Sequence, residues 1–242
     1  MKHIQLLISP SKIVAIAALT SVLASCGGGG SSSPAGNSSP TTITSIDPVG
    51  IVASASSQPL SILGTNFASG MTVSVTDKND TPIYTIGTPV ISTDRTVITV
   101  NVNTTATVPT DNYVNVIVKS SSGTTLATAV LGVAGASRTI AQHVQSIFDA
   151  HCIACHDGTA PSYLDLRSSA SAAGLINELS TLCSTKLRVT PGDPRRTSSV
   201  LIDKISGGSP ACGNPMPMPL GSQPLSATDI QTIIDWVAGG VN

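Results

Sequence analysis

The stretch Cys152-Ile153-Ala154-Cys155-His156 decides how the second half of this chain is interpreted. Two thiols at this spacing can each form a thioether with a vinyl group of one porphyrin. The histidine that follows can bind the porphyrin iron through a ring nitrogen. The stretch therefore predicts one covalent haem c, attached through Cys152 and Cys155, with His156 as an axial ligand of the iron. A surface CxxC redox pair and half of a zinc site are the alternatives for the same spacing.

A helix is expected immediately before this motif. Thr139 and Gln142 form a capping-box pattern at its start. The apolar residues that follow fall on one helical face: Ile140, Val144, Ile147 and Phe148. His143 and His151 lie on the same helix, tethered to the His156 side of the haem. We therefore expect these two histidines to be solvated rather than to bind the iron.

A second helix is expected near the end of the sequence. Ser226 and Asp229 predict its start, and Gly239-Gly240 predicts its end. The apolar stripe consists of residues at helical spacing: Ile230, Ile233, Ile234 and Val237. Trp236 flanks this stripe, and we expect it to pack against the first helix and the haem edge.

The segment Asn214-Pro215-Met216-Pro217-Met218-Pro219-Leu220 offers a second iron ligand between the two helices. A residue before proline is restricted to extended geometry, which suits a loop held across a flat porphyrin face. A His/Met ligand pair leaves no open position at the iron, favours electron transfer and raises the potential. The alternative is that both methionines fill gaps in the core.

The motifs of residues 136–242 resemble those of a family of bacterial monohaem cytochrome c domains of the class I type. Met218-Pro219-Leu220-Gly221 with Pro224-Leu225-Ser226 resembles a segment in which that family's methionine binds the iron. Further matching stretches are Leu164–Arg167, a helix over Leu175–Leu182, Arg188–Pro194 and Ser199–Leu201. The resemblance implies an all-α cytochrome c fold with Met218 as the axial ligand and Met216 as the runner-up.

Of the five cysteines, Cys183 and Cys212 remain once Cys152 and Cys155 are assigned to the haem and Cys26 to a lipid anchor. Two leftover thiols in an oxidising, extracytoplasmic space are expected to form a disulfide, which would anchor the Met218 loop. The alternative, zinc shared with Cys152 and Cys155, lacks the second close pair of ligands that structural zinc sites show. Four arginines are candidates to pair with the haem propionates: Arg167, Arg188, Arg195 and Arg196.

The N-terminus predicts export and attachment to a membrane. The apolar run Ile13–Leu23 is too short to span a bilayer and fits the core of a secretory signal. Leu23-Ala24-Ser25-Cys26 resembles the lipobox of bacterial lipoproteins, which implies a signal peptide over 1–25 and a lipidated Cys26. Gly27 after the cysteine resembles the signal for the outer membrane. Residues 26–42 are then a flexible tether. A plain signal peptide with an incidental cysteine is the alternative.

Residues 43–135 carry short runs rich in β-branched residues, separated by turn residues. The runs are Leu60–Leu63, Met71–Val75, Ile83–Ile86, Val97–Val102, Val114–Val118 and Thr125–Val130. This spacing predicts an antiparallel β-sandwich. Ile46-Asp47-Pro48 and the stretch Leu60–Phe67 resemble the start of an IPT/TIG immunoglobulin-like domain. The predicted fold is therefore an N-terminal all-β sandwich followed by the all-α cytochrome c domain.

Composition limits the choice of function. Charged residues make up 10% of the chain and the formal net charge is −1, which predicts no nucleic-acid binding. The expectations together describe a membrane-anchored monohaem cytochrome that passes single electrons between redox partner proteins in the cell envelope, and no enzyme. An axial Met218 argues against a peroxidase. The alternative is an envelope adhesion or binding protein whose β-sandwich is the functional module.

Overall fold

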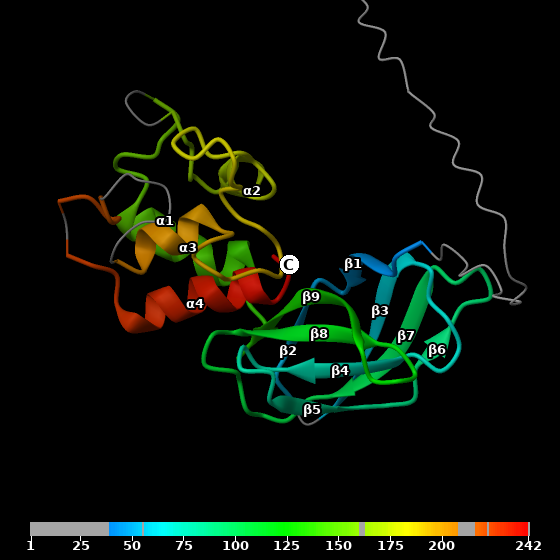
Figure 1. Ribbon diagram of the computed structural model, residues 1–242. Coiled ribbons are helices and arrows are strands. Elements are labelled where there is room, and N and C mark those ends of the chain that lie inside the picture. Colours follow the sequence, from blue (N-terminus) through cyan, green and yellow to red (C-terminus); the bar gives the residue numbers. More distant parts are fainter. Residues whose placement is uncertain (1–38, 55, 160–162, 208–215, 222, 242) are drawn as a thin grey trace, which may run out of the picture. The chain divides into compact units, whose positions relative to one another are not determined.

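The computed structural model describes residues 39–54, 56–159, 163–207, 216–221 and 223–241 (Figure 1). The predicted signal peptide, Cys26, most of the tether and Cys212 lie outside these residues. From Ser39 onward the chain forms one compact unit. No helix within the described ranges is both long enough and apolar enough to cross a membrane.

The first part of the described chain consists of strands. They are β1 (Thr42–Asp47), β2 (Gly50–Val52), β3 (Ser57–Thr65), β4 (Thr72–Thr76), β5 (Pro82–Ile86), β6 (Val90–Ile91), β7 (Val97–Asn103), β8 (Tyr113–Lys119) and β9 (Thr125–Ala134). Short helices follow: the π-helix η1 (Ile140–Val144), then α1 (Gln145–His151), α2 (Ser171–Leu175), α3 (Val200–Ile205) and α4 (Ala227–Ala238).

The strands form a nearly closed, eight-stranded mixed barrel. Its order is β1-β3-β7-β5-β4-β8-β9-β2, and β6 pairs with β7 beside this path. The two ends of the path, β1 and β2, are consecutive in the chain and separated only by Pro48 and Val49. The pairing of β2 with β9 is parallel, whereas the other pairings are antiparallel.

The predicted antiparallel, immunoglobulin-like sandwich is therefore wrong as a fold. Each of the six predicted runs overlaps a strand (β3, β4, β5, β7, β8 or β9). A sandwich would keep two separate sheets, but β5 pairs with β4 through Val75↔Tyr84 and with β7 through Thr85↔Asn103. It thereby joins the two sheets into one. Alternation of apolar residues indicates which residues form strands, but it carries no information about such a shared neighbour.

The barrel core follows from the alternation in the sequence. In β7, Ile98, Val100 and Val102 are buried, while Thr99 and Asn101 between them are exposed. The same core contains buried residues of the neighbouring strands: Leu60, Ile62, Val114, Val116, Val118 and Leu131. Burial of each such side chain contributes about 1.5–3 kcal/mol relative to leaving it in water.

The helical region has a second core and starts as the sequence predicts. The Thr139 hydroxyl accepts a hydrogen bond from the Gln142 amide (3.2 Å), which forms one half of the predicted capping box, while the Thr139 amide donates to His143 Nδ1 (3.2 Å) instead of the Gln142 side chain. Ser226 caps α4 in the same way, by accepting from the Asp229 amide (3.1 Å). Phe148 of α1 and Trp236 of α4 are fully buried in the core that these helices share.

The predicted all-α cytochrome c fold is also wrong. The described chain is mainly β with a few short helices, and apart from α4 these helices span seven residues or fewer. The helix expected over Leu175–Leu182 is not formed, because α2 ends at Leu175. Asn177 adopts a φ of 59° and its amide donates to the Val189 carbonyl (3.1 Å) instead of continuing a helix.

Isolated bridges replace helical hydrogen bonds in this stretch. They connect Ile176 with Val189, Leu179 with Leu187, and Leu187 with Ser199. Backbone groups that a helix would pair within itself are thus paired with residues about ten positions further along the chain. The helix was implied by the resemblance to the cytochrome c domains, whereas the apolar residues of the stretch are also compatible with this irregular arrangement.

Close backbone approaches connect the barrel to α4. We call Gly50, Gly132 and Gly192 the glycine seam. A Cβ atom at Gly50 or Gly132 would overlap the carbonyl oxygen of Ala238, and one at Gly192 would overlap that of Val49. The Gly192 amide donates to the Val237 carbonyl (2.8 Å). Only glycine permits contacts this close, so the seam explains how two cores form one unit.

A buried carboxylate adds to this connection. Asp235 of α4 is 5% exposed. One of its oxygens, Oδ1, accepts from the Gly135 amide (2.9 Å) and from the Gln231 side-chain amide (3.0 Å). Gly135 directly follows β9, so this residue ties the exit of the barrel to the last helix.

Candidate haem-binding site

The cysteine motif forms a tight turn at the end of α1. The Cys152 amide donates to the Phe148 carbonyl (2.8 Å), so the turn begins on the helix itself. The Cys152 carbonyl then accepts from the amides of Cys155 (3.1 Å) and His156 (2.9 Å). Both sulfur atoms and the imidazole therefore belong to one compact segment, which the helical core holds through Phe148.

The two cysteines differ in their surroundings. Both carry a thiol; Cys152 is half-buried and packs against the helical core, whereas Cys155 is exposed. Burial raises the pKa of the Cys152 thiol to about 11. Redox-active CxxC motifs depend on a lowered thiol pKa. The raised value therefore disfavours the interpretation of this motif as a redox pair.

His156 is held by its backbone on both sides. Its amide donates to Cys152, and its carbonyl accepts from the Leu166 amide (2.8 Å). The Nδ1 atom is buried and has no hydrogen-bond partner among the described residues. Burial also lowers the pKa of the imidazole, which favours the neutral form that binds metals. These features leave a neutral imidazole whose Nδ1 is not engaged by any described group, which suits a role as an axial haem ligand.

The methionine loop is fixed to α3. The Met218 amide donates to the Lys204 carbonyl (2.9 Å), and the Lys204 ammonium donates to the Met216 carbonyl (3.3 Å). Met218 is half-buried, whereas Met216 is 49% exposed. The less exposed of the two thioethers is thus that of Met218, which the family resemblance implies as the axial ligand.

Other predicted site residues are placed in part. Cys183 is disulfide-bonded, and because Cys212 lies outside the described residues, their pairing stays a prediction. His143 Nδ1 accepts from the Thr139 amide (3.2 Å) within the helix cap, and His151 is exposed. The zinc alternative gains no support, because no three His, Cys, Asp or Glu side chains gather into a metal-binding group in the described part of the chain.

The four arginines expected near the haem propionates all contact protein acceptors. Arg167 pairs with Asp165 (2.6 Å), Arg195 with Asp193 (2.5 Å), and Arg196 with Asp203 (3.0 Å), while Arg188 donates to the Gly174 carbonyl (2.7 Å). Arg195 also lies over the ring of Tyr113, 5.6 Å from its centroid. Their role as propionate partners stays a prediction.

Sequence reasoning missed two buried polar residues beside the site. Gln145 of α1 donates to the Leu166 carbonyl (2.8 Å) and accepts from the Ser171 hydroxyl (2.8 Å), so it fixes the segment whose amide holds His156. Lys204 is 7% exposed. A signal for Lys204 exists, since it and Asp203 are the charged residues in the otherwise apolar run Val200–Ile205.

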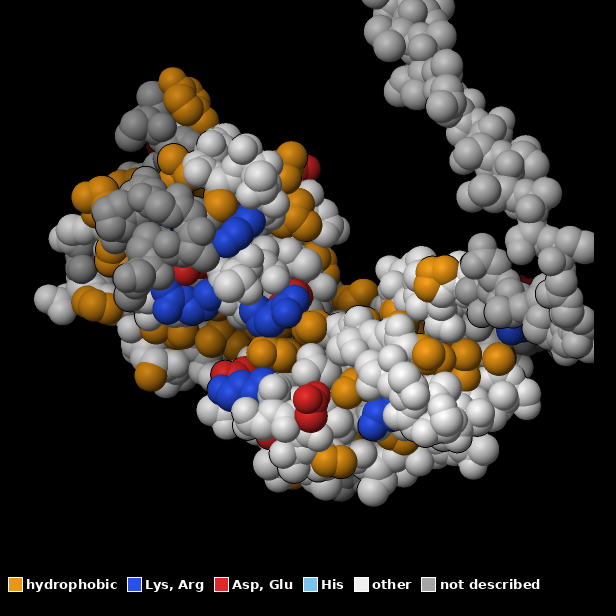
Figure 2. Space-filling view, viewed as in Figure 1, with side chains coloured by type: hydrophobic (Ala, Val, Ile, Leu, Met, Phe, Trp, Pro, Cys, Tyr) orange, Lys and Arg blue, Asp and Glu red, His pale blue; other side chains and the backbone are white. Residues whose placement is uncertain are grey.

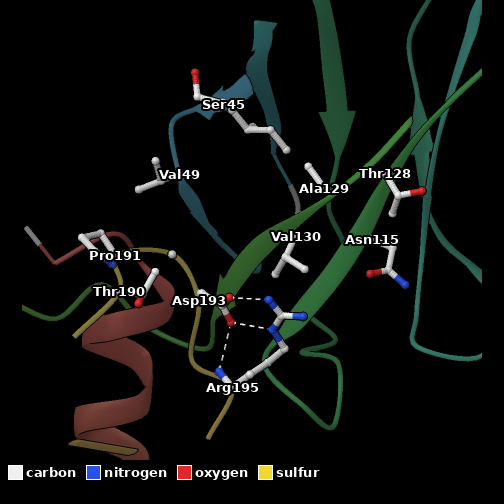
Figure 3. A pocket seen from close by; sticks show the side chains of 12 residues that line it. Ser45, Val49, Asn115, Thr128, Ala129, Val130, Thr190, Pro191, Asp193 and Arg195 are labelled. Atoms are coloured by element: carbon white, nitrogen blue, oxygen red, sulfur yellow. Dashed lines mark hydrogen bonds and ion pairs between the residues drawn. The ribbon is translucent and has the colours of Figure 1, made fainter. Parts of the chain in front are cut away.

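Two cavities of the described structure lie away from this motif. One, of about 570 Å³, is lined by barrel residues and by the segment 190–195, where Asp193 and Arg195 face each other (Figure 3). A second, of about 300 Å³, lies beside α4 and includes Arg138 and Asp235. Of the residues predicted to bind the haem or its iron, the propionate candidate Arg195 lines the first cavity, whereas Cys152, Cys155, His156 and Met218 line neither.

Comparison with known proteins does not add to this geometry. No protein-family model and no curated protein matches the chain. The proposed function therefore rests on the residues of the CxxCH turn and of the methionine loop.

Proposed function

We propose that this protein is a membrane-anchored electron carrier of the cell envelope that binds one haem c. Cys152 and Cys155 form the thioethers, and His156 and Met218 are the axial ligands. When bound, the haem supplies a reversible one-electron couple between ferrous and ferric iron. The observation that carries the proposal is a CxxCH turn whose buried histidine nitrogen has no hydrogen-bond partner among the described residues.

The surrounding residues support this role by fixing the ligands. The turn of the motif holds Cys152 against the helical core, and Leu166 holds the carbonyl of His156. Gln145 connects Leu166 to α1, so the backbone of His156 is fixed to this helix by a chain of hydrogen bonds. Rigid ligands suit electron transfer, because an iron site that keeps its geometry needs little reorganisation when its charge changes.

The surface supports transient partners rather than a strong electrostatic hold. Charged side chains of both signs are sparse on the face shown in Figure 2, where uncharged polar and hydrophobic side chains predominate. The formal net charge of −1 agrees with this view. We propose that redox partner proteins meet the haem through brief contacts, and that a lipid on Cys26 holds the protein at the membrane, with the outer membrane favoured by Gly27.

The alternative function, an envelope binding protein that acts through its barrel, is supported by one observation. The cavity of about 570 Å³ is lined largely by barrel residues, among them Ser45, Asn115 and Thr128. A binding protein would keep its ligand when haem attachment is prevented. The haem proposal is favoured because the motif and its histidine require an explanation that the cavity does not provide.

The test is expression in a host that matures c-type cytochromes, followed by visible spectra of the oxidised and reduced protein. We expect a c-type α-band, and haem that stays on the polypeptide under denaturing conditions. His156→Ala should change the spectrum strongly, whereas His151→Ala, an exposed histidine on α1, should not. A colourless wild-type protein would contradict the proposal.

A further inference from the structure

Lys204 occupies an unusual position for a lysine. It is 7% exposed and lies in α3, where its neighbours Ile202 and Ile205 belong to the helical core. Lysine is rarely buried to this extent, because removing an ammonium from water is costly unless polar groups of the protein replace the water. The polar contacts of Lys204 should therefore explain its place.

Two of these contacts reach the same tripeptide. The Lys204 carbonyl accepts from the Met218 amide (2.9 Å), and the ammonium donates to the Met216 carbonyl (3.3 Å). Pro217, between them, has no amide hydrogen to donate. One residue thus fixes the loop at both ends of the segment that separates the two candidate sulfur ligands.

The platform that carries Lys204 is itself fixed. Asp203, its neighbour, is 3% exposed and pairs with Arg196 at 3.0 Å. Ile202 and Ile205 pack in the core that also contains Phe148, the residue whose carbonyl accepts from the Cys152 amide. The methionine loop and the CxxCH turn are therefore both fixed to the same core.

We infer that Lys204 is a positioning residue that makes Met218, and not Met216, the sulfur ligand of the iron. This inference rests on the proposed haem function. Lys204 acts through the loop: with both ends of the tripeptide held, Met218 stays half-buried while Met216 is 49% exposed. A thioether is a weak ligand, so a restrained loop increases its effective concentration at the iron.

The test compares variants of the haem-loaded protein. Lys204→Met keeps the aliphatic stem and removes the donor, Lys204→Arg keeps a donor, and Lys119→Met changes a lysine of β8 as the matched control. Added imidazole competes with the thioether, and loss of the near-infrared Met–iron band reports the exchange. For Lys204→Met we expect the apparent Kd for imidazole to fall by about tenfold or more, as expected for loss of one hydrogen bond from a charged donor. Lys204→Arg should restore most of the difference, and Lys119→Met should behave as wild type.

Amide hydrogen exchange provides a second readout that does not depend on the iron band. In Lys204→Met, exchange at the Met218 amide should accelerate by at least about tenfold, because the loop loses the hydrogen bond from the ammonium to the Met216 carbonyl. Unchanged imidazole affinity together with unchanged exchange would overturn the role of Lys204. If Lys204→Met does not fold, Lys204→Leu gives the same comparison, because this shorter side chain also lacks a donor.

Failure of the haem proposal is distinguishable from failure of this inference. A wild-type protein without the near-infrared band contradicts ligation by methionine altogether. A wild-type band that Met216→Ala abolishes and Met218→Ala retains keeps the haem proposal and overturns the selection of Met218. A band that only Met218→Ala abolishes, together with the expected Lys204 effects, supports both.

Discussion

The barrel and the helical region differ in how their buried polar groups are paired. In the barrel, strand ladders pair the backbone, and the core consists of apolar side chains such as Leu60 and Ile62. In the helical region the elements are short, and side chains take over the pairing. The charged residues that the structure shows as buried all lie there: Asp203, Lys204 and Asp235. The region with the least regular backbone therefore depends most on specific polar contacts. This is also the region that carries the proposed haem ligands.

The largest effect is expected from a cavity in the helical core. Phe148→Ala should destabilise the protein by about 3–5 kcal/mol, since a fully buried aromatic side chain is removed. Urea unfolding followed by circular dichroism and by the fluorescence of Trp236, the single tryptophan of the sequence, measures it. Leu60→Ala in the barrel is the matched variant. Because the cores form one unit, both probes should shift together in both variants; separate transitions would show that the two regions unfold independently.

A smaller effect is expected at the glycine seam. Gly132→Ala places a methyl group against the Ala238 carbonyl, so the strand and α4 must move apart. We expect a loss of about 1–3 kcal/mol, as for other overpacked sites. Gly87→Ala is the control, because its Cβ would meet its nearest neighbour at an ordinary contact distance of 3.5 Å. Equal stability of the two variants would remove the seam as the connection between the cores.

The two cysteines of the motif should differ in reactivity before haem is attached. Burial raises the pKa of Cys152 to about 11, so a small fraction of this thiol is ionised at pH 8. Since the thiolate is the nucleophile, iodoacetamide should modify the exposed Cys155 at least about tenfold faster than Cys152. Peptide mapping by mass spectrometry of the haem-free protein measures both rates. Faster reaction at Cys152 would show that the helical core does not shield that sulfur.

The smallest effect concerns Asp165, which is paired with Arg167 just after the motif. The hydrogen bond from the Arg167 side chain is the main cause that lowers the pKa of Asp165 from 3.8 to about 2. Because the pKa of Asp165 is lower in the folded protein than in the unfolded chain, the ionised carboxylate stabilises the folded state at a pH above the unfolded pKa. That contribution is lost as the pH falls from about 4 to about 2. Carboxyl NMR titration should give a midpoint near 2, and Arg167→Met should move it towards 3.8. A wild-type midpoint already near 3.8 would mean that the pair does not form in solution.

The sequence predicts different aspects of the barrel and of the helical region. In the barrel, alternation located six strands of the described chain, β3, β4, β5, β7, β8 and β9, because one buried face imposes a period of two. It missed β1, the two-residue β6 and also β2, which has three residues and pairs in parallel with a strand far along the chain. Pairing partners depend on contacts between distant residues, and no local pattern reports them. For that reason the sequence did not predict that β5 pairs with both β4 and β7, which makes the fold a barrel and not a sandwich.

In the helical region, spacing located the chemistry but not the support around it. The CxxCH motif is visible because its residues must be adjacent to react with one porphyrin. Gln145 and Lys204 act through contacts with Leu166 and Met216, which lie 21 and 12 positions away. A buried charge inside an apolar run was the available signal for Lys204, and it indicates an unusual site without naming the partner.

The glycine seam has a consequence for how this barrel varies among related proteins. Gly50 and Gly132 do not have the positive φ angles that demand glycine, so their backbone would accept any residue. The restriction comes from the Ala238 carbonyl and, at Gly132, also from the Gly192 carbonyl. A homologous barrel that is not followed by this helical region should therefore carry ordinary side chains at both positions, and glycine at both would mark ancestry in which the two parts were inherited together.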